Sequence, residues 1–173
     1  MQVREIDILN TLPTSKVHFI LNPSLWDSFD DEIKVRLHET PIWNEAKFLD
    51  TNGSISGEMN CLPKDAGGIY LFVAKPNFIP NSHLYLMYVG RAHYTATQNI
   101  RKRCRGYINE QSRPKIKKMI EGWGKYLYIR YLPLTDNNLI DLIESEIINK
   151  ILPPFNDAIP DKQIRDAVKA FSI

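Results

Sequence analysis

The chain has 173 residues, of which 43% are hydrophobic, and a net charge of +2. This is enough for one compact domain and leaves no material for a second full core. No apolar run approaches the length of a membrane span, and two cysteines are too few for a disulfide framework or a structural zinc site. The N-terminus shows neither a secretory nor a transit signal. We therefore expect a cytoplasmic protein with no membrane partner.

Charge is distributed unevenly along the chain. Between Arg91 and Arg130 there are eleven Lys and Arg residues against two acids, a local balance of +9 in a chain whose total is +2. A concentrated positive segment is the expected footprint of a protein that binds a phosphate backbone. Charge alone is explained equally well by a solvated surface with no such partner.

The first sixty residues carry the weakest signals. Segment 17–21 is compatible with a strand, Asn22-Pro23 with the opening of a helix, and 24–39 with an irregular helical stretch. Segment 51–53 has the chemistry of a turn. We expect residues 1–60 to form an accessory segment.

Two strands and a hairpin loop are predicted next. Segments 68–74 and 84–89 are rich in aromatic and branched residues. The polar, proline-bearing segment 75–83 between them is typical of a hairpin loop. A third strand is predicted over 125–132, where hydrophobic residues alternate.

Helical spacing marks the other elements. A helix of about ten residues is expected after Gly90. Its apolar face consists of Ile100, Cys104, Tyr107 and Ile108. A second helix opens at Ser112 and Pro114 and ends at Gly124.

The last long helix is predicted over 139–152. Thr135 and Asp136 are its capping candidates, and Pro153-Pro154 ends it. A short terminal helix is expected over 161–171. The order strand, strand, helix, helix, strand, helix indicates an α/β fold with a small three-stranded sheet, mixed or antiparallel, flanked by helices.

Glu144 is the most informative position on the long helix. At about 100° per residue it falls in the middle of an apolar stripe and is expected to point toward the core. The stripe consists of Ile140, Ile143, Ile147, Ile148 and Ile151. A buried carboxylate needs a cation, a metal ion or strong donors nearby. The alternative to a metal ligand is a structural ion pair, with Arg103 as the obvious partner.

Arg103 and Tyr107 lie one helical turn apart in the basic segment and share an edge of their helix. Arg103 borders the apolar stripe of that helix, as expected for a guanidinium that faces a semi-enclosed site. Its fixed fork of donors suits phosphate oxygens. A lone arginine on a basic helix is more often a surface residue.

The tripeptides Gly68-Ile69-Tyr70 and Tyr88-Val89-Gly90 resemble the two half-motifs that name the GIY-YIG nuclease superfamily. Val89 stands where isoleucine is usual. The step of 18 positions from Tyr70 to Tyr88 is longer than in the shortest family hairpins.

Further positions follow in the family's order. Arg103 with Tyr107 is similar to the family's arginine and its His or Tyr one turn later. Glu144 with Asn156 is similar to its glutamate and trailing asparagine. The resemblance covers residues 67–157, and it implies a nuclease core over 61–157 between the accessory segment and a helical tail at 158–173.

The resemblance implies a DNA endonuclease that uses one divalent ion, Mg²⁺ or Mn²⁺, with Glu144 as its acidic ligand. Arg103 would stabilise charge on the phosphate oxygens, and Tyr70 is assigned as general base. A neighbouring metal and guanidinium would favour its phenolate near neutrality. Tyr88 and Tyr107 would orient water or phosphate, and these tyrosine roles are exchangeable.

Asn156 has two interpretations of equal weight. It either holds a phosphate or braces the glutamate, or it only caps a turn. His93, close to the second half-motif, is interpreted as a surface residue.

The basic segment supplies the expected contacts to the DNA backbone. They are Arg91, Arg101, Lys102, Arg105, Lys115, Lys117 and Lys118.

Within nucleases, the small size favours a restriction-type enzyme over a DNA repair, mobile-element or defence nuclease. Cutting both strands of a palindromic site would imply a homodimer with twofold symmetry. An alternative from another class is a domain that binds DNA without cutting it. The presence of all six family positions speaks against that alternative.

Overall fold

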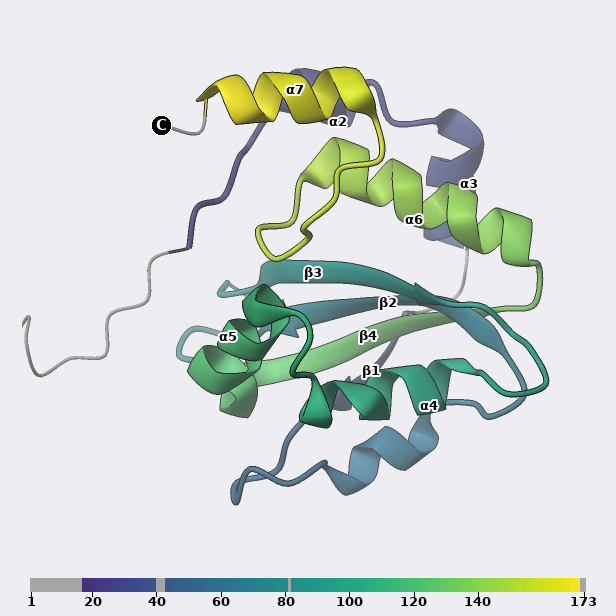
Figure 1. Ribbon diagram of the computed structural model, residues 1–173, viewed down its shortest axis with the longest axis vertical. Coiled ribbons are helices and arrows are strands. Elements are labelled where there is room, and N and C mark those ends of the chain that lie inside the picture. The colour runs from purple at the N-terminus through teal and green to yellow at the C-terminus, as the bar shows by residue number, and fades with distance from the viewer. Residues whose placement is uncertain (1–16, 40–42, 81, 172–173) are drawn as a thin grey trace, which may run out of the picture.

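The computed structural model describes residues 17–39, 43–80 and 82–171. At its centre is a four-stranded antiparallel sheet of order β1-β4-β2-β3, which confirms the expected α/β class (Figure 1). The strands are β1 (Asn44–Lys47), β2 (Gly67–Ala74), β3 (Tyr85–Ala92) and β4 (Leu127–Leu134).

The expected number of three strands is wrong, because β1 adds a fourth strand at the β4 edge of the sheet. This strand comes from the segment that the sequence marked as accessory. It is four residues long, and only Ala46 among them is buried. One buried residue in four gives no readable alternation, so the strand is specified by its pairing with β4.

Helices cover both faces of the sheet (Figure 1). On the face toward the top of Figure 1 lie α2 (Pro23–Asp27), α3 (Asp31–Glu39), α6 (Asn137–Ile151) and α7 (Lys162–Phe171). On the other side lie α4 (Ile100–Arg105), α5 (Pro114–Trp123) and the 3-10 turns η1 (Gly57–Cys61), η2 (Gly106–Asn109) and η3 (Gly124–Tyr126). None of the helices in the described part of the chain has the length and apolarity that a bilayer crossing needs.

Local capping chemistry sets several helix boundaries as expected. The Asn22 side chain accepts from the backbone of Leu25 at the start of α2. Asp136 caps α6 in the same way by accepting from two backbone N–H groups. The strand considered over residues 17–21 is not formed, since this stretch has no regular secondary structure.

The sheet separates two hydrophobic clusters. Because side chains alternate along β2, Tyr70 and Phe72 enter the cluster on the α4 face, whereas Ile69 packs with the isoleucines of α6. β3 is the edge strand next to β2. Groups from the two faces of the sheet can therefore meet around this edge.

Candidate active site

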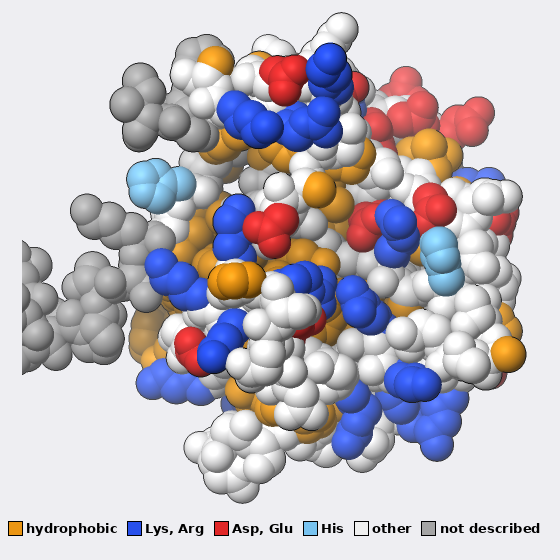
Figure 2. Space-filling model, in the orientation of Figure 1, with side chains coloured by type: hydrophobic (Ala, Val, Ile, Leu, Met, Phe, Trp, Pro, Cys, Tyr) orange, Lys and Arg blue, Asp and Glu red, His pale blue; other side chains and the backbone are white. Residues whose placement is uncertain are grey.

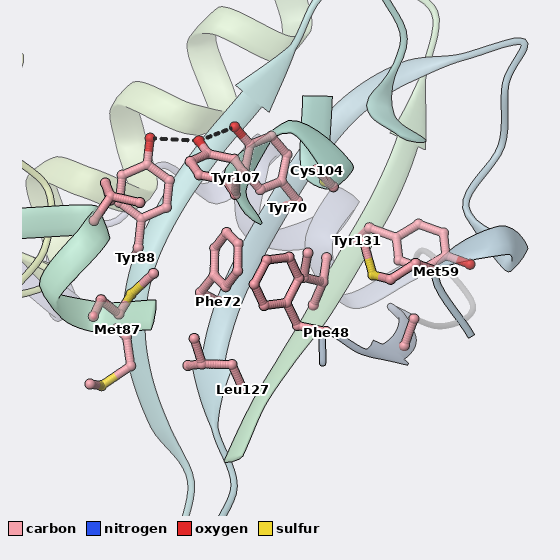
Figure 3. Packing of buried hydrophobic residues seen from close by; sticks show 14 of the residues in the cluster. Phe48, Met59, Tyr70, Phe72, Met87, Tyr88, Cys104, Tyr107, Leu127 and Tyr131 are labelled. Carbon is pink, nitrogen blue, oxygen red and sulfur yellow. Dashed lines mark hydrogen bonds between the residues drawn. The ribbon is translucent and has the colours of Figure 1, made fainter. Parts of the chain in front are cut away.

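Three tyrosine hydroxyls from three elements meet on the α4 face. Tyr70 comes from β2, Tyr88 from β3 and Tyr107 from η2, and all three side chains are buried. The Tyr107 hydroxyl lies 2.6 Å from that of Tyr70 and donates to that of Tyr88 at 3.3 Å (Figure 3). The three hydroxyls thus form one hydrogen-bonded chain.

Two guanidinium groups flank this chain. Arg103 Nε donates to the Tyr70 hydroxyl at 3.2 Å, and its guanidinium carbon lies 5.3 Å from the centre of the Tyr107 ring. Arg113 Nη1 lies 3.4 Å from the hydroxyls of Tyr88 and Tyr107, and its guanidinium carbon is 4.8 Å from the Tyr107 ring centre. The two positive charges favour the ionised form of the hydroxyl groups in this chain.

Each half-motif contains a glycine at a position where a side chain would clash with its surroundings. Gly90 pairs with Tyr70 across the strands, and a Cβ at Gly90 would lie 2.6 Å from the Tyr70 hydroxyl oxygen. Gly68 has a φ of 139°, and a Cβ there would lie 2.1 Å from the backbone oxygen of Leu132. Any other residue at either position would have to move the strands or the tyrosine.

Glu144 reaches the site from α6, on the other face of the sheet. Its side chain is only 13% exposed. Burial raises the pKa of this carboxyl, while the neighbouring Arg91 charge acts in the opposite direction. The prediction of a largely buried carboxylate with a cation beside it is confirmed.

The partner expected for that carboxylate is wrong. Arg91, rather than Arg103, donates to Glu144, through Nη1, and its Nε lies 2.9 Å from Asp141 Oδ1. Arg91 pairs with Ile69 in the strand register, so its side chain lies on the α6 face, whereas Arg103 approaches from the Tyr70 face.

A cavity of about 410 Å³ joins these groups. Its lining includes Tyr70, Tyr88, Arg91, His93, Arg103 and Glu144. His93 Nε2 is 2.5 Å from the Asp141 oxygen that Arg91 also contacts. Glu144 in the lining and Asp141 behind Arg91 and His93 form an acidic wall on α6, and Arg103 of α4 lines the same space.

Burial raises the pKa of the Tyr70 hydroxyl well above its usual value, and the neighbouring tyrosines add to this effect while Arg103 opposes it. Burial also raises the pKa of Tyr88. These shifts run against the expected phenolate near neutrality. Burial therefore disfavours a phenolate at Tyr70 in the protein alone, because the phenolate would lack solvent and Arg103 is its adjacent cation among the described residues.

Asn156 makes a paired contact with the backbone of β3. Its Oδ1 accepts from Val89 N at 2.9 Å, and its Nδ2 donates to Val89 O at 2.8 Å. Both ends of the amide are therefore used in holding the segment after α6 against the edge strand. This structural role differs from both expectations, since the side chain neither caps a turn nor contacts Glu144 in the described residues and instead holds β3.

Two of the expected phosphate contacts tie α4 to the η1 region. Arg101 donates to the backbone oxygens of Asn60 and Leu62, and Arg105 Nη1 donates to Asn60 Oδ1 at 2.9 Å. These arginines have a structural role whether or not they meet DNA.

The four lysines among the expected phosphate contacts differ in whether they already bind another group of the protein. Lys102 Nζ donates to the Thr97 backbone oxygen at 2.7 Å. Lys115 pairs with Asp157 at 3.1 Å, and Lys117 approaches Glu121 at 3.8 Å. Lys118 is exposed. In Figure 2, Lys and Arg side chains lie over the whole face, including its top, while Asp and Glu are denser toward the top and upper right.

The acidic wall carries ligands of the type that a hard divalent ion uses. Asp141 and Glu144 lie about one helical turn apart on α6, and their oxygens converge on one cationic group. One or two carboxylates, with waters completing the shell, is the usual set of ligands for protein-bound Mg²⁺. Within the described ranges, no group of three or more His, Cys, Asp or Glu side chains is placed to hold a metal ion.

Sequence reasoning missed Arg113 and Asp141, and it set aside His93, which lines the cavity. Arg113 was counted only as part of the basic segment, and its stacking on Tyr107 follows from the turn between η2 and α5. Asp141 carried one usable signal, because it precedes Glu144 by three residues and so shares its side of the helix.

Comparison of the chain with protein-family models, curated proteins and solved structures finds no match. The likeness to GIY-YIG nucleases therefore rests on the half-motifs and on the residues of the site alone.

Proposed function

We propose that this chain is a metal-dependent DNA endonuclease that hydrolyses phosphodiester bonds with one divalent ion, Mg²⁺ or Mn²⁺, at Glu144. The observation that carries the proposal is the convergence of separate elements on one site. A tyrosine hydroxyl chain, a guanidinium and a buried carboxylate come from β2, β3, α4, η2 and α6 and meet at or directly below the cavity.

Arg103 is placed to hold the substrate phosphate. Its Nε donates a hydrogen bond to the Tyr70 hydroxyl, and this bond fixes the orientation of the guanidinium. No described residue accepts a hydrogen bond from the two terminal nitrogens, so both can serve the non-bridging oxygens at the cavity. Charge that develops on these oxygens in the transition state would be stabilised by such a fixed donor.

Tyr70 is the proposed acceptor of the proton from the attacking water, a role in which it must first release its own proton to solvent at the cavity. A bound divalent ion supplies a Lewis acid and favours ionisation of nearby groups. Loss of the Tyr70 proton would be matched within the chain, since Tyr107 can turn its O–H toward Tyr70 at 2.6 Å. Arg113 Nη1 then remains as a donor to Tyr107.

Double-stranded DNA is the proposed substrate, and a restriction-type enzyme acting as a homodimer is the proposed kind of nuclease. Support for DNA comes from the basic segment, which includes the exposed Lys118 and the partly exposed Lys117. Support for the restriction type comes from the small chain, and the homodimer follows only if the target is palindromic.

The proposal is tested by incubating the purified protein with plasmid and phage DNA in Mg²⁺ or in EDTA and separating the products on a gel. We expect cleavage in Mg²⁺ alone. Discrete bands would support a sequence-specific enzyme, and a smear a nonspecific one. DNA that stays intact but shifts in the gel would contradict the nuclease proposal in favour of a binding module.

A further inference from the structure

We propose that Arg91 occupies the metal position of the free protein, as an internal counter-ion of Glu144, and is displaced when the divalent ion binds. This inference rests on the proposed function, because it concerns the metal site assigned there. It also reconciles the expected role of Arg91 as a phosphate contact with a structure in which its guanidinium binds carboxylates.

The geometry places one guanidinium between two acids of α6. Arg91 Nη1 donates to Glu144 Oε2, and Arg91 Nε lies 2.9 Å from Asp141 Oδ1. The side chains of Arg91 and Asp141 are 41% and 45% exposed, whereas that of Glu144 is 13% exposed. Among the described residues, Arg91 thus supplies the positive charge that neutralises the buried carboxylate of Glu144.

A metal ion and this guanidinium compete for Glu144 in the observed arrangement. Nη1 sits directly on Oε2, which is an oxygen that an ion would bind, and two cations at that distance repel each other. An ion that binds Oε2 therefore has to break a charge-assisted hydrogen bond first. The free protein should bind divalent ions more weakly than its acidic wall alone would allow.

Asp141 limits how far Arg91 moves when the metal ion displaces it from Glu144. It holds a different nitrogen of Arg91 from the one that Glu144 holds, so the Glu144 contact can break while the Asp141 contact remains. His93 contacts the same Asp141 oxygen and limits the freedom of that carboxylate. Arg91 would stay beside the cavity, with Nη1 free to take a phosphate oxygen.

As a consequence, the affinity of the protein for the metal ion is coupled to its affinity for DNA. A phosphate offers the displaced guanidinium a replacement partner, so DNA lowers the cost of moving Arg91 and strengthens metal binding. By reciprocity, the metal ion strengthens DNA binding by the same factor.

The test is Mn²⁺ binding to the DNA-free protein, measured by loss of the six-line electron paramagnetic resonance signal of free Mn²⁺. Wild type is compared with Arg91→Gln, with Arg103→Gln and with Glu144→Gln. Arg103→Gln is the matched control, since it removes a positive charge from the same cavity without touching Glu144. Arg91→Met, which keeps the aliphatic stem, serves the same comparison if Arg91→Gln does not fold.

We expect the Arg91 variant to bind Mn²⁺ at least about tenfold more tightly than wild type, the factor that corresponds to removing one competing charge-assisted hydrogen bond. Arg103→Gln should change the affinity far less, and Glu144→Gln should abolish binding. Equal affinities for wild type and the Arg91 variant, or equal gains in both arginine variants, would overturn the counter-ion role and leave the metal site standing. Binding that survives Glu144→Gln unchanged would overturn the metal site itself, and the inference with it.

Discussion

The ring of Tyr70 on β2 fills the space that a side chain at Gly90 on β3 would need. A Cβ at Gly90 would lie 2.6 Å from both the ring carbon Cζ and the hydroxyl oxygen of Tyr70. Gly90 of the second half-motif has no side chain, and Tyr70 of the first half-motif crosses the space left free to reach Tyr107. The two tripeptides act as one steric unit.

Gly90→Ala should therefore disturb the hydroxyl chain. The added methyl group has to push Tyr70 or β3 aside, and overpacking of this kind typically costs about 1–3 kcal/mol of unfolding free energy. Nuclease activity should fall more than the loss of folded protein explains. Urea unfolding and a cleavage assay on the same preparation measure the two effects.

Gly106→Ala is the matched control. A Cβ at Gly106 meets nothing within 4 Å, and the residue has right-handed helical backbone angles. The change should leave stability unchanged or raise it by up to about 1 kcal/mol. A Gly90→Ala protein as stable and active as the Gly106→Ala protein would contradict the steric account.

Asn156→Ala should destabilise the protein by about 1–3 kcal/mol, because it leaves the Val89 N–H and C=O without their side-chain partner. The exposed Asn138 on α6 provides a control substitution to alanine with little effect on urea unfolding. If Asn156→Ala instead lost activity at unchanged stability, a direct role in phosphate binding would be favoured over the structural one.

Lys118→Gln and Arg101→Gln should affect DNA binding differently. Lys118 is exposed, so its loss should weaken binding and reduce the slope of log affinity against log salt by about one unit, with unfolding unchanged. Arg101 holds two backbone oxygens, so its loss should also lower the unfolding midpoint. Fluorescence anisotropy of a labelled duplex over a KCl series, beside urea unfolding, separates the two. Equal salt slopes for wild type and Lys118→Gln would remove Lys118 from the DNA contact surface.

Glu110 should contribute to stability in a defined pH window. Hydrogen bonds from Ser112 and Arg113 lower its pKa from 4.5 to about 2. A lowered pKa stabilises the folded state above the unfolded-state value, and this contribution is lost as the pH falls from about 4.5 toward 2. Thermal unfolding should show Glu110→Gln melting below wild type near neutral pH, with the difference shrinking on acidification. A difference that stays constant across this range would contradict the assignment.

The long, periodic elements could be predicted from the sequence. Strands β2, β3 and β4, and helices α5 and α6, lie within a few residues of their predicted positions. Their hydrophobic repeats are long enough to identify the period, and Asp136 and Pro153 mark the ends of α6. β1 could not be predicted, because its stability comes from pairing with β4, more than eighty residues later.

The site was predictable as a set of residues but not as a network. Sequence order indicated Tyr70, Tyr88, Arg103, Tyr107 and Glu144, and the structure brings them together. The pairing of Arg91 with Glu144 of α6 depends on which face of the sheet the Arg91 side chain occupies, and the strand register decides this. Burial likewise raises the pKa of Tyr70, an effect that the tripeptide does not reveal.

The most direct test of the account compares Glu144→Gln with Glu146→Gln in single-turnover cleavage of DNA with Mg²⁺. Both glutamates lie on α6, but Glu146 accepts from the Asp30 backbone N–H and lies near Lys150, away from the cavity. We predict that Glu144→Gln lowers the cleavage rate by at least about a hundredfold while DNA binding in EDTA is retained, and that Glu146→Gln cleaves like wild type. Wild-type cleavage by Glu144→Gln would contradict the central claim that this buried carboxylate holds the metal ion of a nuclease site.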